Sequence, residues 1–96
     1  MILWKHHIKE DYPKGVTVTG VGKGGHLHED LSHLIDYLKK DGREWTVARI
    51  ECADRDVIPD QNQGTGWYKA VHDIPLKGED KFISLEEATK KYLKRS

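Results

Sequence analysis

Hydrophobic and polar positions alternate in the first part of the chain. Residues 2–8 are rich in apolar and β-tolerant side chains, and residues 16–21 alternate apolar with polar positions. A period of two is typical of half-buried strands, and Pro13 and Gly15 between the two segments are turn residues. This part of the sequence therefore predicts a β-hairpin.

From Leu27 the period lengthens to that of a helix. Leucine recurs at positions i, i+4, i+7 and i+11, namely at Leu27, Leu31, Leu34 and Leu38. On a helix this spacing places the four side chains in one narrow stripe. Acidic residues lie in its first turn, and Gly42 follows its end. The pattern predicts an amphipathic helix that ends before Gly42.

Two further strands and a second helix follow. Residues 44–52 and 66–74 have the β-branched and aromatic content of strands, and residues 53–65 between them have the composition of a loop. Ser84 and Glu87 stand in the spacing of a capping box, ahead of an apolar helix face. This segment predicts a second, shorter helix.

The predicted order of elements is ββαββα, and residues 82–83 allow a short fifth strand. We expect residues 1–96 to form one α+β domain with a four-stranded, mostly antiparallel sheet and both helices on one face. Such an arrangement buries the leucine stripe and one side of each strand. The two halves share no residue repeat, so the prediction is a repeated layout and not a duplication.

Composition indicates a small soluble globular protein. Sixteen basic and sixteen acidic residues cancel, and no apolar run approaches the length of a membrane span. Zero net charge argues against an indiscriminate nucleic-acid coater, because phosphate affinity comes from clustered Lys and Arg. The basic residues at 90–95 are then a solvated helix end. The lack of a long apolar run predicts no membrane partner. Since Cys52 is the only cysteine, we expect a cytoplasmic protein without a disulfide.

Glycines precede the first predicted helix at the spacing of a nucleotide-binding loop. Gly20, Gly22 and Gly25 satisfy G-x-G-x-x-G between a predicted strand and a predicted helix. Gly22, Lys23 and Gly25 would then form a phosphate loop. However, the chain is short for the parallel sheet of a dinucleotide fold, and the acids that follow stand at unsuitable distances. The simpler interpretation is a flexible exit from strand to helix.

Histidine and carboxylate side chains occupy one flank of the same predicted helix. His26, Asp30 and His33 recur at i, i+4 and i+7, and Tyr37 continues the row. Two imidazoles and a carboxylate on adjacent turns are able to hold Zn²⁺ or another divalent metal. In the alternative interpretation the histidines are hydrogen-bonded or surface residues, and Asp30 favours the helix dipole.

Tryptophans mark both strands of the second half. On the first strand Trp45 and Arg49 share one side, and on the second Trp67 and Lys69 do so. The opposite sides carry smaller or apolar residues, which we expect to face the helices. The four larger side chains would then be exposed, and tryptophan and arginine are enriched at binding hot spots. Because a register error reverses every side chain, the opposite assignment stays open.

Three functions follow from these features. The first is a non-enzymatic binding module without a cofactor, a small accessory or inhibitory protein that contacts a protein partner through the tryptophan side and the loop at 53–65. The second is a small metal-dependent hydrolase or nuclease with His26, Asp30 and His33 as ligands. The third is a nucleic-acid binder that stacks bases on the tryptophans and contacts phosphates through the basic helix end at 90–95. We expect the first, and a homodimer through an exposed strand edge stays open.

Overall fold

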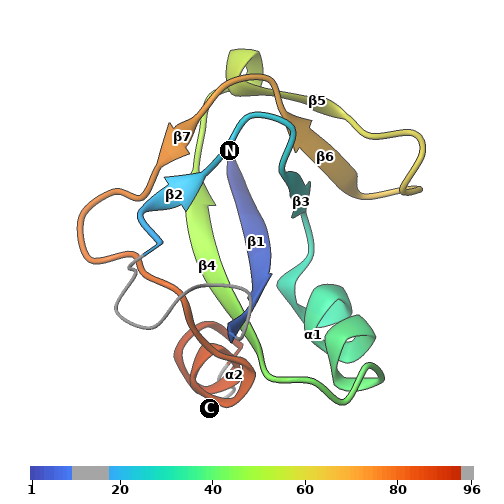
Figure 1. Cartoon of the computed structure of the whole chain (residues 1–96), viewed down its shortest axis with the longest axis vertical. Helices are drawn as coiled ribbons and strands as arrows, with labels where there is room; N and C mark the ends of the chain where they lie inside the picture. Colours follow the sequence, from blue (N-terminus) through green and yellow to red (C-terminus); the bar gives the residue numbers. More distant parts are fainter. Residues whose placement is uncertain (10–17, 94–96) are drawn as a thin grey trace.

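Eight strands and two helices make up the described part of the chain, residues 1–9 and 18–93 of a computed structural model. They are β1 (Ile2–Ile8), β2 (Gly20–Val21), β3 (His26–His28), α1 (Leu31–Lys39), β4 (Trp45–Glu51), β5 (Val57–Pro59), β6 (Trp67–Ala70), β7 (Ile74–Pro75), β8 (Ile83–Ser84) and α2 (Leu85–Tyr92), with a 3₁₀ turn η2 (Asp54–Asp56). Six strands form one antiparallel sheet in the order β5-β6-β3-β1-β4-β8, and β2 pairs with β7 in a separate ribbon (Figure 1). The predicted α+β class is confirmed, but the main sheet has six strands instead of four. No helix in these segments is long and apolar enough to span a membrane.

The pairing of the strands differs from the two predicted hairpins. β1 lies between β3 and β4, and β2 pairs with β7 instead of β1. The strands predicted at 44–52 and 66–74 are not neighbours, because β4 pairs with β1 and β8, and β6 pairs with β3 and β5. Turn signals are local, whereas these pairings join distant segments. The predicted turn at Pro13 and Gly15 and the strand residues 16–17 lie outside the described residues.

α1 begins later than the leucine pattern suggests. Leu27 belongs to β3, and the helix begins at Leu31, after the N-cap Asp30. The Asp30 carboxylate accepts a hydrogen bond from the backbone amide of His33 at 3.1 Å. α2 begins as predicted, with Ser84 as the N-cap whose hydroxyl accepts a backbone hydrogen bond. The first helix therefore begins four residues later than predicted. The prediction was wrong there because Leu27, a buried strand residue, happens to fit the spacing of the helix leucines.

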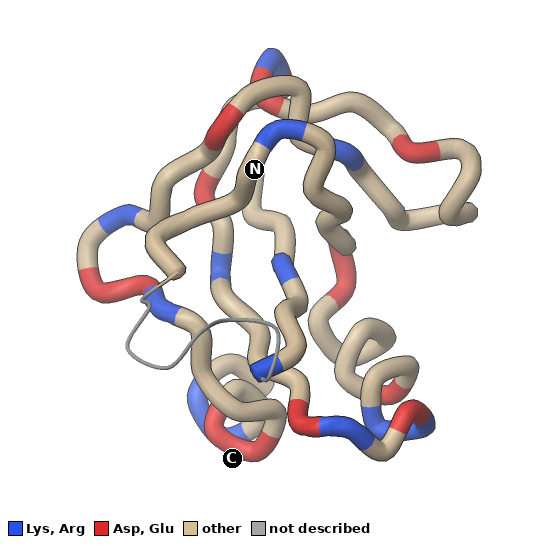
Figure 2. The backbone as a smooth tube through the Cα atoms, viewed as in Figure 1, with Lys and Arg blue, Asp and Glu red and all other residues tan. Residues whose placement is uncertain are grey.

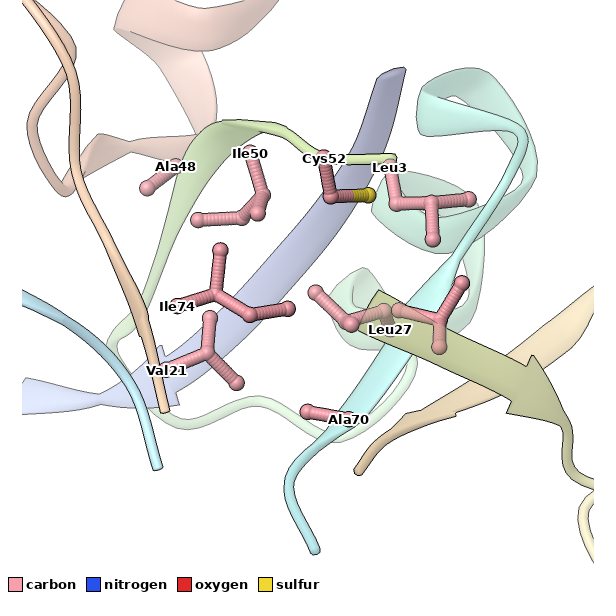
Figure 3. Packing of buried hydrophobic residues seen from close by; sticks show 9 residues of the cluster. Leu3, Val21, Leu27, Ala48, Ile50, Cys52, Ala70 and Ile74 are labelled. Atoms are coloured by element: carbon pink, nitrogen blue, oxygen red, sulfur yellow. The ribbon is translucent and has the colours of Figure 1, made fainter. Parts of the chain in front are cut away.

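Each face of the main sheet carries part of a buried core. On one face the sheet packs against the β2–β7 ribbon, where Ile74 lies beside Ile50, in a cluster that also contains Leu3 (Figure 3). On the other face, the apolar sides of α1 and α2 join one cluster with Val47. Successive residues of a strand point to opposite faces, so β4 needs apolar residues at neighbouring positions, and Val47 and Ala48 supply them. We call the two faces the ribbon-side face and the helix-side face.

Gly20 provides a test of the ribbon. A Cβ atom there would lie 2.3 Å from the carbonyl oxygen of Ile74 and 2.8 Å from the Cα of Pro75. We expect Gly20→Ala to lower the free energy of unfolding by about 1–3 kcal/mol, the usual cost of overpacking. Gly22→Ala is the matched control, since its Cβ would meet only Asp73 Oδ1, at 4.0 Å. Urea unfolding measures both, and equal midpoints would contradict the pairing of β2 with β7.

Candidate functional site

The glycine loop leads into a strand and not into a helix. It forms a tight turn between β2 and β3, in which the Gly25 amide donates to the Gly22 carbonyl at 2.9 Å. The Lys23 amide donates to the Asp73 carboxylate at 2.8 Å, and the Gly24 amide donates to a carbonyl of β6. Phosphate binding needs free amides and an adjacent helix N-terminus. In the predicted phosphate loop the three successive amides of residues 23–25 already have protein acceptors, and no helix begins next to it.

The three predicted metal ligands have separate structural roles. His26 lies in β3, and its Nδ1 is 2.6 Å from Asp60 Oδ2. Asp30 caps α1, and the His33 ring stacks on His28 with ring centroids 5.2 Å apart. Because His26 is not on the helix, the predicted row at i, i+4 and i+7 does not exist. Within residues 1–9 and 18–93, no group of three or more His, Cys, Asp or Glu side chains is placed to hold a metal ion.

The tryptophan side faces the helices, which reverses the predicted assignment. Trp45 and Trp67 pack against the cluster formed by α1 and α2, while the smaller residues of β4 and β6 face the ribbon. Arg49 donates to Asp80 at 3.0 Å, and Lys69 is exposed. Covering indole rings with two helices removes more apolar surface from water than covering small residues would. The four predicted residues therefore share a face, but the helices cover part of it.

Five rings form a continuous aromatic row on the helix-side face. The ring centroid of Trp67 lies 4.7 Å from that of His28, 5.7 Å from that of His6 and 6.1 Å from that of Tyr37. His6 in turn lies 5.2 Å from Trp45. Tyr37 is 57% exposed, whereas Trp45 and Trp67 are half-buried. The row therefore extends from the interior of the protein to solvent.

A cavity of about 360 Å³ opens beside Trp45 and is lined by His6, Tyr37, Leu38, Lys40, Asp41, Arg43 and Trp45. The Trp45 indole N–H donates to Asp41 at 2.7 Å, and the Arg43 guanidinium lies 5.1 Å from the Trp45 ring centroid. Hydrogen bonds from Arg43 and Trp45 hold the pKa of the Asp41 carboxyl below its usual range. These contacts fix the orientation of the indole at the edge of the row.

Asp60 lies at the other end of the same face. It is 6% exposed, and the loop that follows it surrounds a second cavity of about 340 Å³, the loop cavity, which is lined by Pro59, Asp60, Gln61, Gly64, Thr65, Gly66, Trp67 and Tyr68. The predicted loop at 53–65 is thus partly regular, because it contains η2 and β5. Sequence analysis missed Asp60. Its only signal is its position between a short apolar run and a polar, glycine-containing loop.

The histidines of the aromatic row are poor proton acceptors. Burial, together with the charges of Lys5 and neighbouring histidines, lowers the pKa of His6 to about 4. Burial, with a smaller contribution from the charge of His33, also lowers the pKa of His28, although the carboxylates of Asp30 and Glu29 act in the opposite direction. The amide of Asp30 donates to His28 Nδ1 at 2.9 Å, so that nitrogen carries no proton. At neutral pH both rings therefore act as uncharged packing groups.

Comparison with known proteins identifies no relative. No protein-family model matches the chain, and neither a curated protein nor a solved structure matches it significantly. The function is therefore argued from the geometry and chemistry of the chain itself.

The buried histidines predict a loss of stability in mildly acidic solution. An unfolded histidine takes up a proton near pH 6.5, whereas folded His6 does so only near pH 4. Between these values the unfolded state binds more protons, so the free energy of unfolding falls as the pH decreases, by about 1–3 kcal/mol for the partly buried His6. Urea unfolding between pH 7 and pH 4 measures this fall.

His6→Phe keeps a ring in the row without the titrating group, and we expect it to flatten the pH profile. Asp41 and Asp56 have lowered carboxyl pKa values, and they affect the free energy of unfolding only at lower pH, since an unfolded aspartate protonates near 3.8. A profile of His6→Phe identical to that of the parent protein would contradict the role assigned to His6.

Asp30 tests whether the predicted ligands are structural. We expect Asp30→Ala to lower the free energy of unfolding by about 1 kcal/mol, because the cap on the His33 amide is lost. Asp36→Ala, on the exposed side of α1, is the control and should change it by less than about 0.5 kcal/mol. Thermal unfolding with and without Zn²⁺ measures both. Stabilisation by Zn²⁺ that is lost with Asp30 would favour a metal site instead.

Proposed function

We propose that the protein is a non-enzymatic binding module that contacts a protein partner through the uncovered part of the helix-side face. This binding face comprises Tyr37, Ile58, Trp67 and Lys69. The observation that carries the proposal is the exposure of two large apolar side chains there, Tyr37 at 57% and Ile58 at 46%. The Tyr37 ring contacts Trp67, and Ile58 lies opposite Lys69 in the β5–β6 pairing.

This combination has the composition of a binding hot spot. Aromatic rings bury a large area at a low cost in conformational entropy, and hot spots lie where such rings are surrounded by other contacts that exclude water. Trp67 is already held by its neighbours in the aromatic row, so a partner would meet a rigid ring. The exposed Lys69 supplies a polar rim.

Charge favours a protein partner over nucleic acid. Basic and acidic residues are interspersed along the described chain (Figure 2), and the net charge of the full sequence is zero. Arg49 of the predicted hairpin is paired with Asp80 at 3.0 Å, and Lys90 of the basic helix end with Glu86 at 3.3 Å. The predicted basic residues Lys94 and Arg95 lie outside the described residues. Phosphate affinity depends on clustered unpaired cations, which these pairs reduce.

Side chains, and not strand addition, would make the contact. β5 is an edge strand, and positions 56 and 60 hydrogen-bond to the β6 side. In an antiparallel pair the intervening residues, Val57 and Pro59, direct their backbone groups outward. The Val57 amide already donates to the Asp54 carbonyl, and Pro59 has no amide. This edge offers no outward donor at these two positions, which disfavours a homodimer through β5.

A cytoplasmic location belongs to the same proposal. Cys52 is the only cysteine of the chain, and it is buried. Burial raises the pKa of its thiol, which keeps it in the unreactive protonated form. A chain without a disulfide is suited to a reducing compartment.

The proposal can be tested with peptides that are selected from a displayed library for binding to the parent protein. Tyr37→Ala combined with Lys69→Ala should weaken the selected peptides about tenfold or more, because it removes hot-spot contacts. Both side chains are exposed, so the fold should persist. The matched control is Glu86→Ala combined with Lys90→Ala, an exposed pair on α2 that should leave affinity unchanged. Peptides that bind the Tyr37 and Lys69 variant as tightly as the parent would overturn the proposal.

A further inference from the structure

The loop cavity has a buried carboxylate in its wall. Asp60 lines this cavity and is 6% exposed, with Oδ2 held 2.6 Å from His26 Nδ1. A carboxylate accepts several hydrogen bonds, and one that is largely removed from water gains strongly from further donors. His26 supplies one donor to one oxygen, which leaves acceptor capacity on the carboxylate.

Three backbone amides of the loop are already used. The Asp60 amide donates to the Trp67 carbonyl at 2.9 Å, the Gln63 amide to the Asp60 carbonyl at 3.1 Å, and the Trp67 amide to the Gly64 carbonyl at 3.3 Å. The polar side chains that line the cavity are those of Asp60, Gln61, Thr65 and Tyr68, and the Asp60 carboxylate is the one charged group among the lining residues. A cationic donor group complements the charge of this carboxylate, whereas an anion would be repelled by it.

Negative charge and an aromatic ring complete the site. Glu29 Oε1 lies 3.3 Å from the position that a Cβ atom would take on Gly66, one of the lining residues. No lysine or arginine is among the residues that line the cavity. Trp67 is in the wall, and an indole attracts a cation. A guanidinium group fits best, because it is planar, carries five donors and no acceptor, and stacks on aromatic rings.

We propose that the loop cavity binds the guanidinium group of an arginine side chain of the protein partner, an inference that rests on the proposed function. The guanidinium donates hydrogen bonds to the free acceptor capacity of Asp60 and lies against Trp67. Tyr37 and Ile58 provide apolar contacts outside the cavity, so the arginine adds specificity to an otherwise apolar binding face.

Titration with N-acetyl-arginine methylamide, followed by nuclear magnetic resonance, tests the inference without a known partner. We expect saturable shifts at the amides of Gly64 and Gly66 and at the indole N–H of Trp67. The citrulline analogue has the same shape without the charge, and it should bind at least about tenfold more weakly. Absence of saturable shifts, or equal binding of the two compounds, would overturn the inference.

Asp60→Asn should weaken the arginine compound at least about tenfold, since it removes the charge of the acceptor. Asp54→Asn, exposed on η2 and outside the cavity, is the matched control and should bind normally. Because Asp60 also holds His26, a second variant leaves that pair intact. Thr65→Lys, at an exposed position, should fill the cavity with an internal ammonium group and block the arginine compound. Normal binding by either cavity variant would overturn the inference.

The variant with Tyr37→Ala and Lys69→Ala separates the two proposals. It keeps the cavity, so it should bind the arginine compound normally while losing the selected peptides. Loss of arginine binding in this variant would contradict a separate cavity site. Conversely, a parent protein that binds the peptides through Tyr37 but does not bind the arginine compound would retain the proposed function and reject the inference.

Discussion

Seven residue pairs between β1 and β4 determine how the helices and the β2–β7 ribbon pack on the two faces of the main sheet. β1 is an interior strand with a buried core on each of its two sides, and in such a strand a shift of one residue would exchange the buried sets of the two faces. The observed register directs Trp45 and Val47 toward the helices and Ala48 and Ile50 toward the ribbon. The packing of α1, α2 and the β2–β7 ribbon depends on this pairing.

The same arrangement explains why the binding face is only partly open. α1 and α2 lie at one end of the main sheet, whereas β5 and β6 extend away from both helices (Figure 1). The face is therefore covered around Val47 and open around Ile58 and Lys69. Trp67 lies at the boundary, where its ring contacts Tyr37 of α1 and its residue also lines the loop cavity. Trp67 thus takes part both in the packing of the core and in the wall of the proposed binding cavity.

Histidine makes this boundary chemically unusual. His6 fills the space between two tryptophans, and its Nδ1 is buried with no hydrogen-bond partner within the described residues. Leaving such an atom unsatisfied costs about 1–3 kcal/mol, so the site is less stable than an all-carbon core of the same shape. His28 avoids this cost because the Asp30 amide satisfies its Nδ1. The rings orient Trp67 at neutral pH, and their protonation would oppose the same packing.

By itself, the sequence determined the local features of the protein: the α+β class, strands β1 and β4, and the capped start of α2. These depend on residue periodicity and on contacts a few residues apart. Only the tertiary structure decided that Leu27 belongs to a strand and that Trp45 and Trp67 face the helices, because alternation defines the two sides of a strand but not which cover each side receives. It also decided the pair of His26 and Asp60, which are 34 positions apart and meet only because β3, β6 and β5 are neighbours in one sheet.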